Sequence, residues 1–297
     1  MRHAGLLSPP LGLPMAIARG GQPPAVSPAE ASLRFRRPVA RLRRLATPEN
    51  RDLLVELVRA GIRTADHNSF LGALWSLLAP FIMLVALYLV FRHRFAAGVP
   101  AYPLYLLVGI SLVNYFVTAT RFGITVLFAN RQLILDSTVP REAVVAAQLA
   151  VHTQKLLMEM AIAAAFSAWY GLFSLGAVLT ALPLLVAYVA LTAGIGLLLG
   201  LVHCFARDVE HIWSLVSRLL LFVTPVFYGL SDLPLLTRAL VCWANPLTPF
   251  LVGIRAALMD QPVSPLLYGY ALLLGTGALA VGYGVFLVLE NAAVERA

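Results

Sequence analysis

Three titratable side chains that could perform chemistry together lie close in the sequence: His152, Lys155 and Glu159. On a helix, spacings of three and four residues place them on one face. A charge inside a bilayer costs about 2.5–3.5 kcal/mol on insertion scales, so it requires a partner. We therefore predict an intramembrane ion pair between Lys155 and Glu159. A proton relay that includes His152 is the alternative interpretation.

Other catalytic chemistry finds no support in the sequence. Lys155 is the only lysine and is followed by Leu156, so the G-x-x-x-x-G-K-[ST] pattern of a nucleotide-binding P-loop is absent. The 6 histidines never show the spacing of zinc ligands, and no G-x-S-x-G motif marks a nucleophile. We therefore expect no catalytic residue, no bound metal and no cofactor in this chain.

The elements that carry these residues must lie in a membrane. Of the 297 residues, 60% are hydrophobic and only 12% are charged, which is about half the charged fraction of typical soluble domains. A chain of this length with 2 cysteines is also not a small scaffold held by disulfides. The composition therefore predicts an all-α polytopic membrane protein.

Six hydrophobic segments are long enough to cross a bilayer, which requires roughly 20 helical residues each. They are residues 74–91, 101–120, 144–170, 177–204, 212–230 and 266–289. An even number of spans places both termini on one side. With the N-terminus inside, 16 arginines lie on the cytoplasmic side and 4 lie outside, so the positive-inside rule predicts cytoplasmic N- and C-termini. We interpret the net charge of +8 as favouring contact with anionic lipid at the membrane surface, and we expect no nucleic-acid partner.

The segment before the first span is expected to stay outside the hydrocarbon core. Residues 1–46 are rich in proline and are predicted to form a disordered cytoplasmic tail, whereas residues 47–297 form the transmembrane domain. From a helix-start signal at Thr47, the apolar spacing predicts an amphipathic helix in the cytoplasmic interface. The polar face of this helix includes Asp52, Glu56 and Arg59.

The segment between the fifth and sixth spans, Ser231–Pro265, is too long for a simple turn and is divided by prolines. Its two apolar stretches, residues 235–243 and 247–259, are too short to cross a bilayer. We therefore expect short re-entrant or interfacial helices on the external side. Trp243 suits the level of the lipid headgroups.

Several motifs occur in an order and spacing that resemble one family of membrane proteins. They are Arg51–Leu54, Ser69–Pro80, Asn130 with Pro140–Glu142, Arg207–Asp208, Thr224–Tyr228, and Asn245–Leu247 with Arg255. Over about residues 50–290, their arrangement is similar to that of ABC-2-type permeases. It most resembles the branch that exports polysaccharides and polyol phosphates, namely O-antigen, capsule and teichoic acid.

The resemblance implies a permease that depends on ATP hydrolysis by another protein. Two copies of the chain would form a homodimer with two copies of a cytoplasmic ABC ATPase, which would bind ATP and Mg. A lipid-linked glycan would cross the bacterial inner membrane between the two permease chains. Coupling to the ATPase would involve Asp52, Glu56, Arg59, Asn130, Arg131, Leu133, Ile134, Asp136 and Arg141. The external gate would include Trp243, Asn245, Pro246 and Arg255.

Aromatic side chains on or beside the second span fit such a cargo, because rings offer flat apolar faces to sugars. The candidates for the substrate pathway are Tyr105, Tyr115, Phe116 and Phe122. Packing inside the bundle or contact with lipid is the alternative interpretation of these rings. Two other functions also stay open: an ABC-2 permease for drugs or small lipids, and a proton-coupled carrier that uses Lys155, Glu159 and His152.

Overall fold

The computed structural model describes residues 52, 55–61, 72–95, 99, 101–129 and 141–296, which form helices and connecting turns without any strand. The predicted all-α fold is confirmed. In chain order the helices are α4 (Gly72–Phe95), α5 (Tyr102–Ala129), α7 (Arg141–Trp169), α8 (Leu175–Phe205), α9 (Val209–Val223), the 3₁₀ helix η3 (Leu230–Asp232), α10 (Leu235–Ala244), α11 (Thr248–Leu258) and α12 (Pro265–Arg296).

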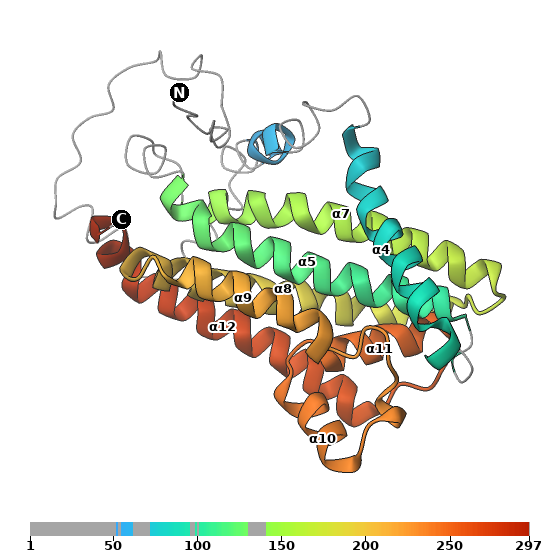
Figure 1. Ribbon diagram of the computed structural model, residues 1–297. Helices are drawn as coiled ribbons and strands as arrows, with labels where there is room; N and C mark the ends of the chain where they lie inside the picture. Colours follow the sequence, from blue (N-terminus) through green and yellow to red (C-terminus); the bar gives the residue numbers. More distant parts are fainter. Residues whose placement is uncertain are drawn as a thin grey trace, which may run out of the picture.

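The long helices α5, α7, α8 and α12 run side by side as a bundle, and α4 crosses this bundle at a steep angle (Figure 1). The short helices α10 and α11 gather at one end of the bundle, which we call the α10–α11 end (Figure 1). α9 lies along α5, where Trp213 Nε1 donates a hydrogen bond to Thr120 Oγ1 at 3.0 Å.

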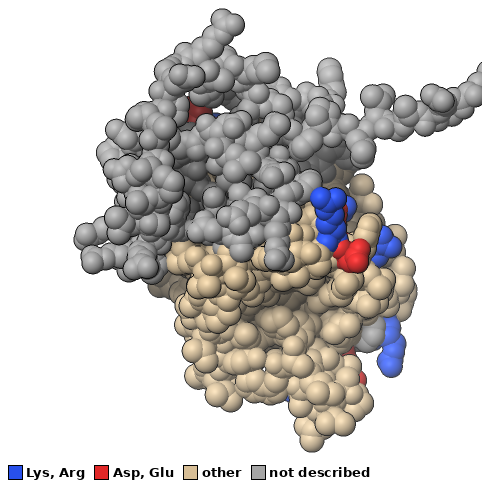
Figure 2. Space-filling view, turned by 90° about the vertical axis from the view of Figure 1, so that its left-hand side faces the viewer, with Lys and Arg blue, Asp and Glu red and all other residues tan. Residues whose placement is uncertain are grey.

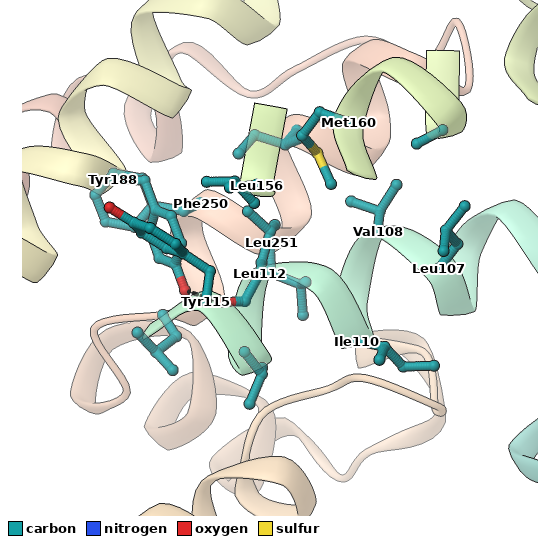
Figure 3. Packing of buried hydrophobic residues seen from close by; sticks show 14 of the residues in the cluster. Leu107, Val108, Ile110, Leu112, Tyr115, Leu156, Met160, Tyr188, Phe250 and Leu251 are labelled. Atoms are coloured by element: carbon teal, nitrogen blue, oxygen red, sulfur yellow. Dashed lines mark hydrogen bonds between the residues drawn. The ribbon is translucent and has the colours of Figure 1, made fainter. Parts of the chain in front are cut away.

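α5 is the central helix of the bundle. Between residues 104 and 113 nearly all its side chains are buried, as expected for a helix that is apolar on every side. Around it, Leu156 of α7, Tyr188 of α8 and Phe250 of α11 fill the space (Figure 3). The interior of the bundle is therefore occupied by packed side chains.

α8 and α12 approach each other closely through glycines. A Cβ atom at Gly194 would overlap the carbonyl of Ala278, and one at Gly275 would overlap the carbonyl of Ala187. Small residues of this kind let helix backbones come together in a membrane, where van der Waals packing has to hold the helices. Larger side chains at these two positions would force α8 and α12 apart.

Among the described residues, three helices are long and apolar enough to span a membrane: Tyr102–Thr125, Leu175–Phe205 and Pro265–Leu289. A fourth span results if Leu235–Ala244 and Thr248–Leu258 are counted together, although the pair is bent by 97°. This bent pair matches the short helices predicted between the fifth and sixth spans. The total of six spans stays a prediction.

The predicted fifth span, residues 212–230, is helical only in its first part. α9 ends at Val223, and its 15 residues extend about 22 Å, which is less than the roughly 30 Å of a hydrocarbon core. The helix stops because Thr224 precedes Pro225 and adopts an extended conformation, with φ −80° and ψ 137°. Residues 224–229 form a non-helical segment, the α9–η3 break.

Part of the predicted amphipathic helix is described, since residues 55–61 are helical. A Cβ atom at Gly61 would lie 2.9 Å from Val151 Cγ2, so this segment packs against α7. The predicted cytoplasmic tail, residues 1–46, lies outside the described residues.

Charged side chains are sparse on the described surface. Figure 2 shows the side on which α12 ends, where the described atoms are mostly uncharged and a few charged side chains gather along one edge. Large apolar side chains are exposed on several helices, for example Ile82 of α4, Leu215 of α9 and Leu273 of α12. Apolar exposure of this extent suits contact with lipid or with another protein chain.

Candidate functional site

A buried arginine of α11 binds the α9–η3 break. Arg255 is only 4% exposed. It donates from Nη1 to Pro225 O and from Nη2 to Val226 O, both at 2.6 Å. Its Nε donates to Tyr105 O at 2.9 Å, and its guanidinium carbon lies 3.5 Å from the centroid of the Tyr105 ring. Three carbonyls and an aromatic face thus surround this buried charge, as a buried charge requires.

Two tyrosines of α5 bind the next two carbonyls of the break. Tyr102 Oη donates to Phe227 O at 2.8 Å, and Tyr105 Oη donates to Tyr228 O at 2.7 Å. The two tyrosines share a face of α5 because they are three residues apart. Phe91 of α4 also stacks on Phe227, with 4.6 Å between the ring centroids. Four consecutive carbonyls that no helix pairs are therefore satisfied by side-chain donors.

Asn245 connects the same break to the bend between α10 and α11. Its Nδ2 donates to Thr224 Oγ1, and its Oδ1 accepts from Leu247 N, both at 3.0 Å. Pro246 follows in the turn that separates the two helices. Two of the predicted gate residues, Asn245 and Arg255, thus bind one non-helical segment, and Pro246 lies in the turn next to Asn245. Their role in gating stays a prediction.

Trp243, the fourth predicted gate residue, lies apart from the break. Its side chain is 47% exposed and packs beside Tyr270 of α12, with 4.9 Å between the ring centroids. Tyr270 Oη also donates to Trp243 O at 2.9 Å. Trp243 therefore attaches α10 to α12.

Gly109 is part of the site, although no local pattern in the sequence points to it. A Cβ atom at this position would overlap Nη2 of Arg255 and would lie 3.1 Å from Val226 Cγ1. Only glycine therefore leaves room on α5 for the guanidinium. Its two neighbours in space lie more than a hundred residues away in the sequence, which explains why spacing rules do not detect it.

Two of the predicted pathway residues are buried in the core. The ring centroid of Tyr115 lies 5.9 Å from that of Tyr188, and the centroid of Phe116 lies 6.0 Å from that of Trp213. Figure 3 shows Tyr115 beside Tyr188 and Phe250. These rings pack the interior in this structure, in agreement with the alternative interpretation. Their contact with a substrate stays a prediction.

Polar side chains line the contact between α5 and α7. Ser111 and Glu159 are both buried, and the hydroxyl of Ser111 faces the carboxyl group of Glu159. One turn further along α5, Tyr115 Oη and Thr153 Oγ1 share a hydrogen bond of 3.1 Å. The bond between Tyr115 and Thr153 joins the two helices at this level. A buried carboxyl group therefore lies inside the bundle with a hydroxyl as its neighbour.

His152, Lys155 and Glu159 share the side of α7 that packs on α5, as their spacing predicts. Phe122 of α5 is 48% exposed, and its ring centroid lies 4.6 Å from that of His152. Lys155 is partly buried and lies within electrostatic reach of both His152 and Glu159. The arrangement brings the three titratable groups together, while the ion pair itself stays a prediction.

The residues predicted to couple to an ATPase are described only in part. The side chains of Asp52, Glu56 and Arg59 are exposed on the short helical segment beside α7. Arg141 is the first residue of α7. The others, Asn130, Arg131, Leu133, Ile134 and Asp136, lie outside the described residues.

Comparison with known proteins shows which family the chain resembles. A family model described as "ABC-2 type transporter" matches residues 53–259, a range that contains the break and all its side-chain donors. A protein of Klebsiella pneumoniae named "O-antigen export system permease protein RfbA" is 24% identical over 239 residues, which are 79% of this chain and 91% of the relative. A protein with the same name from Myxococcus xanthus is 23% identical over 212 residues, which are 71% of this chain and 82% of the relative.

Proposed function

The chain belongs to the ABC-2 type transporter family, as its motifs predict, and we propose that it is the permease subunit of an ATP-driven exporter. Its cargo in this proposal is a lipid-linked polysaccharide of the O-antigen, capsular or teichoic-acid type, which crosses the bacterial inner membrane. The observation that carries the proposal is the family match over residues 53–259. The names of the relatives, which are O-antigen export permeases, support the class of cargo.

The pathway in this proposal lies between two copies of the chain. The interior of one bundle is filled by buried side chains such as Leu104, Val108 and Leu112, so a polymer does not fit through it. α9 offers a surface for a second copy, because none of its 15 residues is buried. Ile212 and Leu215 belong to an exposed apolar stripe on this helix.

An exposed charge on α9 supports a water-filled pathway beside this helix. Arg218 lies ten residues into α9 with its side chain exposed. Against hydrocarbon, such a charge costs about 2.5–3.5 kcal/mol on insertion scales. Next to water in a pathway between two copies, the guanidinium stays solvated. The position of Arg218 therefore favours a homodimer in which α9 borders the pathway.

The energy source in this proposal is a separate ABC ATPase, present in two copies, which binds ATP and Mg. Permeases of this family lack an ATPase domain and work with such a partner, and this chain has no P-loop. The exposed Asp52, Glu56 and Arg59, together with the loop that contains Asn130 and Arg131, would form the cytoplasmic contact.

Simultaneous replacement of Leu133, Ile134 and Asp136 by alanine is expected to uncouple export. An apolar side chain buried at a contact contributes about 1.5–3 kcal/mol, so loss of two should lower export by about tenfold or more. The measurements are glycan export in cells, recovery of the ATPase with the tagged permease, and thermal unfolding of the permease, which should not change.

The matched control replaces three exposed side chains of α12, Leu266, Leu273 and Val288, by alanine. This control removes a comparable apolar surface at sites that face away from the bundle, and it should leave export unchanged. Recovery of no ATPase with the wild-type permease, combined with normal export by the loop variant, would refute the proposed function.

Glu159→Gln separates this function from a proton-coupled carrier. Glutamine has nearly the shape of glutamate and fills the same buried space, and the partly buried Lys155 can extend toward water. We therefore expect ATP-driven export at the level of the wild type. The free energy of unfolding should lie within about 1 kcal/mol of the wild-type value. Glu159→Ala, which removes the group from a buried site, should cost about 1–3 kcal/mol of stability. A folded glutamine variant that binds the ATPase and yet exports nothing would instead support the proton relay.

A further inference from the structure

Arg255 joins three elements that meet at the α10–α11 end: its own helix α11, the α9–η3 break and α5. The guanidinium belongs to α11, and it donates to two carbonyls of the α9–η3 break and to one carbonyl of α5. Its partners are backbone atoms, whose positions are fixed by the course of the chain. The hydrogen bonds of Arg255 therefore depend on the relative positions of three backbone segments: α11, the break and α5.

Separation of α11 from the break would be costly. It would leave a buried guanidinium without two of its three carbonyl acceptors, and it would leave the carbonyls of Pro225 and Val226 unpaired in the protein interior. Buried charges and carbonyls without partners are among the most unfavourable features that a folded protein can contain. The two elements should therefore stay together whenever Arg255 remains buried.

Other contacts reinforce the same arrangement. Tyr102 and Tyr105 attach the break to α5, and Asn245 attaches it to the bend between α10 and α11. The absence of a side chain at Gly109 provides the space that the guanidinium occupies. Tyr102, Tyr105 and Asn245 bond the break directly and Gly109 acts through Arg255, so their effects should combine in one rigid unit.

We propose that Arg255 is a positioning residue that joins the α9–η3 break, α11 and the beginning of α5 into one rigid block, which moves as a unit when the transporter opens. The exit then opens by movement of the two blocks of a homodimer relative to each other. A gate in which α10 and α11 withdraw from the break is excluded by this inference. Its export readout rests on the whole proposed function, whereas its distance readout requires only that the permease binds an ABC ATPase.

A pair of spin labels tests whether the block is rigid. Ser231 of η3 and Gln261, which follows α11, are both exposed, and they can be labelled as cysteines after Cys204→Ala and Cys242→Ala. Electron–electron distances are measured on the permease–ATPase complex without nucleotide and with trapped ATP. Labelled chains are diluted into an excess of unlabelled chains, so that only the distance within one chain is measured. We expect this intrachain distance to be narrow and the same in both states. A second intrachain distance that appears with ATP would overturn the inference.

Three substitutions test whether Arg255 provides the rigidity. Arg255→Met removes the donors, and Gly109→Ala presses on the guanidinium from α5. Both should broaden the distance distribution and lower glycan export by about tenfold or more, as expected for lost hydrogen bonds to a buried charge. Arg255→Lys keeps the charge without the forked donors and should retain part of the export. Arg238→Met, which changes an exposed arginine of α10, is the matched control and should change neither quantity.

The outcomes are distinguishable. Narrow distances and normal export in folded Gly109→Ala and Arg255→Lys proteins would overturn the role of Arg255, even if Arg255→Met does not fold. If the wild-type complex moves no glycan at all, the proposed function fails. The distances between Ser231 and Gln261 then still decide whether the block exists, because they require only the folded complex.

Discussion

Gly275→Leu is expected to prevent stable packing of α12 on α8. Already a Cβ atom at Gly275 would overlap the carbonyl of Ala187, and a backbone carbonyl within a helix cannot rotate away. Overpacking usually costs about 1–3 kcal/mol, and a clash against backbone should exceed that range. We expect loss of folded protein in the membrane, measured as detergent-extracted material that elutes as one species in size-exclusion chromatography and as its thermal unfolding temperature.

Gly277→Leu is the matched control on the same helix. No atom lies within 4 Å of a Cβ atom at Gly277, and the residue is exposed. Leucine is a better helix former than glycine by up to about 1 kcal/mol, so this variant should be as stable as the wild type or slightly more stable. Equal stability of the two variants would mean that the glycine contact between α8 and α12 is not required.

Tyr188→Ala is expected to produce the largest loss of stability among truncations in the core. Tyr188 is 1% exposed, its ring lies 5.2 Å from that of Phe250, and its hydroxyl donates to Leu112 O at 2.7 Å. It therefore connects α8 to both α5 and α11. Removal of a buried aromatic side chain costs about 3–5 kcal/mol, which should appear as a large decrease in the unfolding temperature.

Tyr188→Phe separates packing from hydrogen bonding at this position. The ring remains in contact with Phe250, and only the bond to Leu112 O is lost, which should cost about 1 kcal/mol. We expect normal export by the phenylalanine variant after correction for the amount of protein in the membrane. A phenylalanine variant as unstable as the alanine variant would contradict the packing role of the ring.

The helices themselves follow from local features of the sequence. The predicted spans at residues 177–204 and 266–289 correspond to α8 and α12. Pro234 marks the beginning of α10, and Pro246 lies in the turn between α10 and α11. In a membrane each helix must pair its own backbone groups, so a long apolar run specifies a helix without help from other elements. The break after α9 is also a local effect, since Pro225 disfavours the helical conformation of the preceding residue.

The candidate site was predictable only in part. Asn245 and Arg255 belong to motifs that the sequence already shows, and the structure joins both of them to the α9–η3 break. Their partners could not be predicted, because a hydrogen bond from Arg255 to Tyr105 O joins residues that are 150 positions apart. The count of arginines on each side of the membrane also could not predict the burial of Arg255. It assigns this residue to the external side, whereas the structure buries its side chain in the bundle.

The roles of the aromatic residues on α5 could not be predicted from the sequence either. Tyr105 and Tyr115 lie on one helix and have the same side chain, yet Tyr105 binds the break and Tyr115 packs against Tyr188. Nothing in their local sequence separates these two roles. The difference arises because other helices approach α5 on different sides along its length.

The sequence by itself determined the membrane character, the helical fold and the family, because hydropathy and backbone conformation depend on neighbouring residues. Only the tertiary structure decided that Arg255 is buried against carbonyls, that Gly109 must lack a side chain, and that no residue of α9 is fully buried. The physical reason is that burial and hydrogen bonding of a side chain depend on which distant backbone comes to lie beside it.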